Sequence, residues 1–366
     1  MRNHMTNYSF LTCVALMSCA ANAVLAETRY QITELGTLGG NSYSQAINKA
    51  GNVTGYSYVK PTGITRNAFN WNPLKGIKDM GSLSDLSSFG IDLNNKFQIT
   101  GFSYITETSN TDPTKSETKA RAFFWNSTKG MLNMGSLGGK HSYGYGINNK
   151  GEVVGYSDIA DNTGTHAFIW TKRKGMIDLG TLGGKNSYAN GINKFGYVTG
   201  GSNTQGDTIL HAFLMKPLNR NPSRTLTDIG TLGGDSSAAL AVNDVSQVTG
   251  YSNKVAGDTQ NYHAFLWSER EGMIDLGTLG GGSSNGNDVN NAGVVIGTSQ
   301  FGESKDTHGF IWTKAKGMEN LNNLIPSDSG WTITKANGIN DKGQIAVLGF
   351  KAGVGSRALL LTPIKR

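Results

Sequence analysis

Short alternations of apolar and polar residues run along most of the chain and predict β-strands. In His166-Ala167-Phe168-Ile169-Trp170, the set His/Phe/Trp and the set Ala/Ile would face opposite sides of a sheet. Residues 147–154 read as two strand ends around an Asn/Gly turn. No long stretch has the 3.6-residue period of an amphipathic helix, and proline is nearly absent from the apolar runs. The pattern therefore predicts an all-β protein.

Four strand motifs recur in a fixed order, and each occurs seven times. The first, D-x-G-[TS]-L, recurs at intervals of 45 to 54 residues, around Gly36, Gly81, Gly135, Gly180, Gly230, Gly277 and, in altered form, Asn322. The second ends at Asn48, Asn94, Asn148, Asn193, Asn243, Asn290 and Asn340. The third is a β-branched run into Gly55, Gly101, Gly155, Gly200, Gly250 and Gly297, with Gly349 as its last copy. The fourth is His-Ala-Phe-x-Trp, with Leu359 in place of the seventh Phe.

Four short strands in each unit of about 45–54 residues match the period of a propeller blade. We therefore expect a seven-bladed β-propeller built from seven four-stranded repeats. Residues 29–35 form a first-motif strand and residues 357–361 a fourth-motif strand. Because each end supplies what the other lacks, the two strands are predicted to close the ring within one blade. An open β-solenoid or an irregular stack is the alternative, but it would need polar capping repeats that the sequence lacks.

The first 26 residues have the pattern of a secretory signal peptide. Arg2 precedes an apolar run over residues 10–17, and Val24-Leu25-Ala26 fits cleavage before Glu27. This predicts an exported protein, secreted, periplasmic or at the cell surface, whose residues 27–366 form a single domain. Leu16-Met17-Ser18-Cys19 also resembles a lipobox, so lipid anchoring through Cys19 is a second interpretation. No transmembrane segment is predicted.

Composition excludes several classes of function. Both cysteines, Cys13 and Cys19, lie in the signal segment, so the mature chain is expected to have no disulfide and no thiolate chemistry. The formal net charge is +7, but the basic residues are dispersed apart from Lys172-Arg173-Lys174. Without a basic face carrying aromatic residues, no nucleic-acid partner is predicted. The glycine-rich turns lack the context of a phosphate loop, so no cofactor is predicted.

The repeated histidines His166, His211, His263 and His308 are the candidate binding residues. Imidazoles on one ring of a propeller can bind metal ions or anions. The equivalents Asn67, Arg121 and Arg357 lack the imidazole, however, which favours a structural hydrogen bond to a turn. The repeated first-motif acids have a similar structural interpretation. No metal site and no catalytic residues are predicted.

The tyrosines of the second motif have two interpretations. Tyr43, Tyr143, Tyr145 and Tyr188 follow the Gly-Gly turn. At an exposed rim they would stack on sugar rings, whereas between blades they would be ordinary packing. The residues leave both open.

These motifs resemble those of bacterial extracellular HAF-repeat proteins. The resemblance rests on the tripeptides at residues 166–168, 211–213 and 263–265, and on Asp178-Leu-Gly-Thr-Leu-Gly-Gly184 and its copies. It covers residues 29–363, with departures at Asn67, Arg121, Gly309 and Met215. The resemblance implies export and a repeat fold, and it transfers no catalytic residues.

Repetition without a unique polar cluster predicts a non-enzymatic binding or scaffold module for an extracellular partner, a glycan or an envelope protein. The alternative is a hydrolase or lyase that acts on polysaccharide in the channel of the propeller. That alternative would be indicated by a buried carboxylate or histidine pair that differs from its equivalents in the other blades and lines the channel. The oligomeric state is left open.

Overall fold

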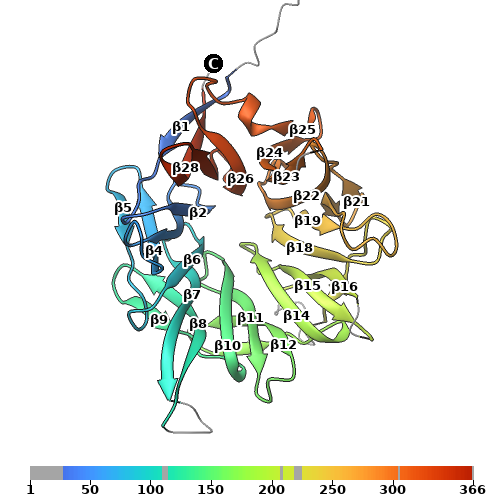
Figure 1. Ribbon diagram of the computed structural model, residues 1–366. Helices are drawn as coiled ribbons and strands as arrows, with labels where there is room; N and C mark the ends of the chain where they lie inside the picture. Colours follow the sequence, from blue (N-terminus) through green and yellow to red (C-terminus); the bar gives the residue numbers. More distant parts are fainter. Residues whose placement is uncertain (1–27, 109–113, 207–208, 218–224, 304–305, 365–366) are drawn as a thin grey trace, which may run out of the picture.

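The protein is a seven-bladed β-propeller (Figure 1). A computed structural model describes residues 28–108, 114–206, 209–217, 225–303 and 306–364. The predicted signal peptide and both cysteines lie outside this part of the chain. Each of the seven sheets has four antiparallel strands, as the repeat predicted. The described residues contain one short 3-10 helix, η1 (Leu321–Asn323), and none of their helices has the length and apolar character needed to cross a bilayer.

The blades follow one another along the chain. Blade 1 holds β2 (Ser42–Ile47), β3 (Val53–Tyr58), β4 (Arg66–Asn72) and β5 (Gly76–Asp79). Blade 2 holds β6 (Ser88–Leu93), β7 (Ile99–Thr108), β8 (Ser116–Asn126) and β9 (Gly130–Asn133). Blade 3 holds β10 (Gly138–Ile147), β11 (Val153–Ile159), β12 (Thr165–Thr171) and β13 (Gly175–Asp178). Blade 4 holds β14 (Gly183–Ile192), β15 (Val198–Thr204), β16 (Leu210–Met215) and β17 (Thr227–Asp228).

The remaining blades repeat this order. Blade 5 holds β18 (Ser237–Val242), β19 (Val248–Ser252), β20 (His263–Ser268) and β21 (Gly272–Asp275). Blade 6 holds β22 (Gly280–Val289), β23 (Val295–Phe301), β24 (Thr307–Thr313) and β25 (Gly317–Asn320). Blade 7 holds β26 (Thr332–Ile339), β27 (Ile345–Lys351), β28 (Gly355–Pro363) and, from the other end of the chain, β1 (Tyr30–Glu34).

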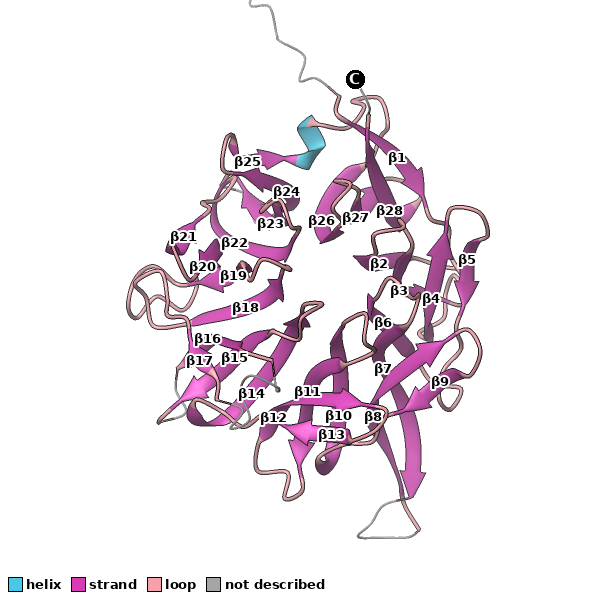
Figure 2. Cartoon of the chain, turned by 180° about the vertical axis from the view of Figure 1, so that it is seen from behind, coloured by secondary structure: helices cyan, strands magenta, loops and turns pink. Residues whose placement is uncertain are grey.

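The predicted ring closure is confirmed. Strand β1 pairs antiparallel with β28, in register from Tyr30 opposite Pro363 to Glu34 opposite Leu359 (Figure 2). The first strand of every blade contacts the first strands of both neighbouring blades, so these seven strands surround the axis. The ring of described blades is therefore continuous, and every blade has a neighbouring blade on both sides.

The core lies between the blades, and the alternation along each third strand determines it. Phe168 and Trp170 pack toward Phe124 of blade 2, whereas Ala167 and Ile169 pack toward blade 4. The repeated Phe is completely buried in six blades, at Phe69, Phe123, Phe168, Phe213, Phe265 and Phe310. The prediction that the two sets face opposite sides of the sheet is therefore confirmed.

Serines of the first strands tie each blade to the one before it. The Ser187 hydroxyl accepts a hydrogen bond from the Ala167 N–H (2.8 Å) and donates one to the Gly180 carbonyl (2.6 Å). The hydroxyl thus satisfies two buried backbone groups at once, one in blade 3 and one in the D-x-G connection to blade 4. The same pair of bonds recurs at Ser88, Ser142, Ser237 and Ser284.

One assignment from the sequence needs correction. The seventh copy of the third-motif glycine was placed at Gly349, but the register puts Val347 at that position, because Val347 pairs with Leu359 as Gly155 pairs with Phe168.

Blade 2 has the longest hairpin ladder. Strands β7 and β8 continue to pair beyond the core of the blade, from Thr106 opposite Thr118 to Thr108 opposite Ser116.

Candidate functional site

The four candidate histidines bind acids or amides of their own blades. The Nδ1 atom of His166 lies 2.8 Å from an Asp178 carboxylate oxygen, and the equivalent distances are 2.6 Å for His211–Asp228 and 2.8 Å for His263–Asp275. In His308 the partner is the Asn320 side-chain amide, at 2.8 Å. The structure therefore distributes the histidines over four blades and brings no two of them together through these bonds.

The aspartate of each His–Asp pair also accepts a hydrogen bond from the turn that follows it. Asp178 accepts a hydrogen bond from the Gly180 N–H at 2.7 Å, so the carboxylate links a third-strand histidine to the D-x-G turn. Asn67, which replaces one histidine, donates to both carboxylate oxygens of Asp79 in the same way. In the described part of the chain no three His, Cys, Asp or Glu side chains converge as metal ligands. The observed geometry is that of a structural hydrogen bond between the third strand and a turn.

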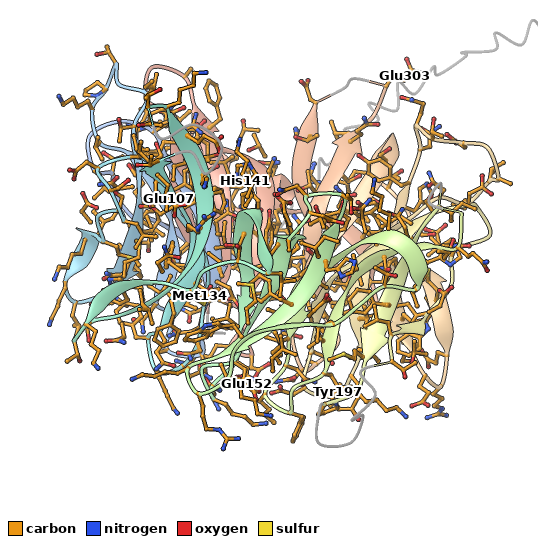
Figure 3. All side chains as sticks on the ribbon, turned by 90° about the horizontal axis from the view of Figure 1, so that it is seen from below. Glu107, Met134, His141, Glu152, Tyr197 and Glu303 are labelled. Carbon is orange, nitrogen blue, oxygen red and sulfur yellow. The ribbon has the colours of Figure 1, made fainter. Side chains whose placement is uncertain are left out.

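Two faces follow from the meander of each blade. The turns after the first and third strands lie at one end of every blade, which we call the turn face. The turns after the second strands and the connections between blades lie at the other end, which we call the link face. Figure 3 shows Glu152 and Tyr197 toward the turn face and Glu107 and Glu303 toward the opposite one.

A closed ring of seven asparagines surrounds the channel at the turn face. The side-chain amide of each second-motif Asn donates to the backbone carbonyl of the equivalent Asn in the next blade, at 2.8 to 3.4 Å. The last bond runs from Asn340 to Asn48 and completes the circle. Each side-chain oxygen accepts at least two backbone N–H groups of its own turn, at 2.8 to 3.1 Å. The ring lines a cavity of about 430 Å³.

A larger cavity, of about 740 Å³, lies deeper in the channel. A β-bulge in every first strand turns one side chain toward the axis, since a bulge re-aims the residue at which the pairing slips. These seven residues all line the cavity: Gln45, Ile91, Tyr145, Asn190, Leu240, Asn287 and Asn337. The two cavities share Asp92, Ile192 and Val242, so they meet at that level.

One wall of the larger cavity is aromatic and the other carries amides. Blades 1 to 3 contribute Tyr56, Phe89, Phe102 and Tyr145. Blades 4, 6 and 7 contribute Asn190, Asn285, Asn287 and Asn337. The aromatic wall continues into a chain of ring contacts across blades 1 to 4, with centroids 4.7 to 5.3 Å apart, through Tyr43, Tyr56, Phe89, Phe102, Tyr143, Tyr156, Tyr145 and Tyr188. The second-motif tyrosines are thus half-buried and packed, and Tyr145 lines the cavity.

Burial affects the tyrosine hydroxyls in the middle of this aromatic cluster. It raises the pKa of Tyr143 to about 12 and also raises the pKa of Tyr156 and Tyr188. A neutral phenol can both donate and accept a hydrogen bond. The cluster therefore offers flat apolar faces with polar edges at physiological pH.

Two aspartates, Asp92 and Asp288, interrupt the ring of small residues at the neck of the channel. The equivalents in the other blades are Ala46, Gly146, Gly191, Ala241 and Gly338. The Asp92 carboxylate accepts hydrogen bonds from the Leu93 N–H (2.7 Å) and, in the next blade, from the Ile147 N–H (2.8 Å). The Asp288 carboxylate accepts the equivalent hydrogen bonds from the Val289 N–H of blade 6 and the Ile339 N–H of blade 7, both at 2.8 Å. Each carboxylate therefore joins two blades.

Replacing both aspartates should change how stability depends on pH. Burial, the main influence, raises the pKa of Asp92 to about 7 and that of Asp288 to about 6. These values exceed the unfolded value of about 3.9, so the folded state binds more protons between about pH 4 and pH 7. The parent should consequently lose free energy of unfolding as the pH rises through this window. Asp92→Asn/Asp288→Asn should gain roughly 5 kcal/mol relative to the parent between about pH 4.5 and pH 8, since each unit of pKa difference corresponds to about 1.36 kcal/mol.

Denaturant unfolding of both proteins at these two pH values would measure the gain. The comparison with the parent cancels the contributions of all other titrating groups. A difference in stability that stays constant from acid to alkaline pH would contradict the raised pKa values.

The two aspartates are not among the residues predicted from the sequence, although the repeat carries a signal for them. They lie two residues before the repeated Asn, at a position that is Gly or Ala in the other five blades. They are also carboxylates that differ from their equivalents in the other blades and line the larger cavity. The bulge residues had no comparable signal, because their direction depends on the slip in pairing.

Comparison with known proteins agrees with the fold. The profile of a family described as "Protein of unknown function (DUF3466)" matches residues 185–356, from within β14 to the start of β28. A search of curated proteins finds no match. The β-propeller domain of the Trilobed protease from Pyrococcus furiosus has a TM-score of 0.50 and 8% sequence identity, over 89% of this chain and 99% of that one.

Two further structures are more distant. TolB from Acinetobacter baumannii has a TM-score of 0.46 and 8% identity, over 92% of this chain and 80% of that one. The gluconolactonase XC5397 from Xanthomonas campestris has a TM-score of 0.39 and 8% identity, over 93% of each chain. The likeness to the Pyrococcus domain concerns the fold alone. That domain is described as having an open velcro topology, whereas here β1 closes the ring against β28.

Proposed function

We propose that this protein is an exported HAF-repeat binding module that holds a glycan, without catalysis, in the larger cavity of its channel. The carrying observation is the cavity itself, in which an aromatic wall faces a wall of amides. The export proposal rests on the signal pattern of residues 1–26 and the HAF assignment on the repeated motifs.

The chemistry of the two walls suits a sugar. The C–H faces of a pyranose are apolar and pack on aromatic rings, here Phe102 and Tyr145. Its hydroxyls need donors and acceptors at fixed positions, which the amides opposite supply. Asn285 lines the cavity, and its side-chain oxygen is buried and has no hydrogen-bond partner within the described residues.

A glycan fits this position better than a protein partner does. The cavity of about 740 Å³ is within the usual range for small-ligand sites and lies inside the channel. A folded envelope protein would contact the rims of the propeller and leave the interior unused. An envelope protein bound at a rim is therefore the less favoured partner.

Tyr145→Ala should weaken glycan binding at least about tenfold, since losing one aromatic stacking surface removes roughly 0.5–1.5 kcal/mol beyond its buried area. The parent would first be screened by thermal shift against bacterial and host oligosaccharides, because a ligand at a hundred times its Kd adds about 2.7 kcal/mol of stability. Isothermal titration of the best ligand would then compare the variants. Tyr251→Ala is the matched control, because Tyr251 packs against Tyr262 in blade 5 and does not line the cavity. Equal losses in the two variants, or saturable binding to none of the glycans, would overturn the proposal.

The aspartates Asp92 and Asp288 favour one second candidate, a polysaccharide hydrolase or lyase. They are carboxylates with raised pKa values in the channel, as general acids often are. Their backbone hydrogen bonds between blades account for both without catalysis, so binding remains the first proposal. Prolonged incubation of the bound glycan, followed by chromatography, separates the two. Cleavage that is abolished by Asp92→Asn or Asp288→Asn would establish the enzyme.

A further inference from the structure

Exposed basic residues gather on the turn face of blades 1 to 4. They occupy the turns after the first and third strands of these blades: Lys49, Lys75, Lys96, Lys129, Lys150, Lys172, Arg173, Lys174, Lys194 and Lys216. Lys150 and Lys194 have carboxylate neighbours, Glu152 at 3.9 Å and Asp244 at 3.1 Å. Basic residues that are dispersed along the sequence therefore lie on one face of the folded protein, because every one of these turns lies at the same end of its blade.

The other half of the turn face has a balanced charge. The corresponding turns of blades 5 to 7 hold Asp244, Glu269, Arg270, Glu271, Lys314, Lys316, Asp341 and Lys342. Lys314 is paired with Glu271 at 2.8 Å. On the turn face, the excess of basic residues is therefore confined to blades 1 to 4, which is the pattern of an interaction surface.

Exposed apolar side chains stand among these basic residues. Leu74 is 96% exposed at the turn between β4 and β5, directly before Lys75. Phe195 is 51% exposed beside Lys194, whose ammonium group lies 4.9 Å from the centre of its ring. Val245, 62% exposed, lies in the neighbouring turn. Apolar tips flanked by lysines gain nothing from a hydrated polyanion, but they do gain from the acyl boundary of a bilayer.

The arrangement of these turns also favours a bilayer. The turns after the first and third strands of successive blades all lie at this end of the ring, so their basic side chains can contact one extended surface together. Lysine and arginine near an anionic leaflet each contribute to such binding.

We infer that the turn face of blades 1 to 4 docks on an anionic lipid bilayer, with Leu74 and Phe195 entering the headgroup region. This inference is independent of the glycan proposal, because it concerns the opposite side of the asparagine ring from the larger cavity. Docking in this orientation leaves the link face directed away from the membrane.

Co-sedimentation with vesicles tests the inference. We expect residues 27–366 to bind vesicles of phosphatidylcholine with about 30% phosphatidylglycerol, and to bind pure phosphatidylcholine much more weakly. Reversing Lys172, Arg173 and Lys174 to Glu should weaken binding about a hundredfold. Reversing Lys60, Lys185 and Lys254 of the link face changes the net charge equally and should leave most of the binding. Melting temperatures of both triple variants would show that they are folded.

Leu74→Ser and Phe195→Ser separate a membrane from a soluble polyanion. Each should weaken vesicle binding several-fold and leave any binding to polygalacturonate unchanged. If both variants bind vesicles as the parent does, or if the two charge-reversal variants lose binding equally, the inference is wrong. Tight binding to polygalacturonate with no preference for anionic vesicles would assign the face to an anionic polymer instead.

Discussion

Removal of residues 28–35 should unfold the propeller at physiological temperature or make it aggregate. The deletion takes away the fourth strand of blade 7, including the buried residues Tyr30 and Leu35, and leaves β28 as an unpaired edge. Burying two such side chains is worth about 3–6 kcal/mol, and the ladder bonds add to this. Since the free energy of unfolding of a domain is only about 5–15 kcal/mol, the deletion removes a large part of it. Thermal unfolding with light scattering would measure it.

A circular permutant is the matched control for this deletion. Arg29 and Ile364 already share a backbone hydrogen bond (2.9 Å), so a short linker can join the two ends. New termini at the exposed Gly257 turn keep every strand in the chain. We expect the permutant to melt within a few degrees of the parent. A deletion variant as stable as the parent would show that the closing strand is dispensable.

Asn94→Ala should destabilise the protein by about 3–5 kcal/mol, whereas Asn95→Ala should cost less than about 0.5 kcal/mol. The Asn94 side chain is buried, accepts hydrogen bonds from the Lys96 and Gln98 N–H groups, and donates to the Asn148 carbonyl of the next blade. Alanine leaves these backbone groups without partners in a place that has little access to water. Asn95 is exposed and accepts one bond, from the Lys49 N–H.

Chemical unfolding of the two variants is the measurement, because the residues are adjacent and the substitution is the same. Hydrogen exchange in the turns of blades 1 and 3 should report the break in the asparagine ring, while the outer strands keep their protection. Equal destabilisation by the two substitutions would mean that the ring contributes nothing beyond its local turns.

The asparagine ring shows which hydrogen bonds can be predicted from the sequence and which cannot. The seven copies of the motif identified the residues, and an Asn before a tight turn predicts bonds to the backbone of its own turn. The bonds between blades could not be predicted, because they join residues 45 to 54 positions apart and, for Asn340 and Asn48, 292 positions apart. They exist only when the ring is closed.

The candidate site divides in the same way. The histidine pairs follow from local register, since the third and fourth strands form one hairpin and His166 and Asp178 are 12 residues apart. The cavity does not follow from local register, because its lining includes the bulged residue of every first strand. A bulge depends on how two strands slip against each other, and side-chain alternation alone gives no sign of it.

The sequence by itself determined the number of blades, the four strands of each and the closure between β1 and β28, because these follow from a repeated period-two pattern and from the motifs at the two ends. Only the tertiary structure decided that Asp92 and Asp288 share a channel, that aromatic and amide walls face each other, and that scattered lysines form one surface. Each of these brings together residues from different blades, and their positions relative to one another are fixed by the packing of seven sheets around one axis.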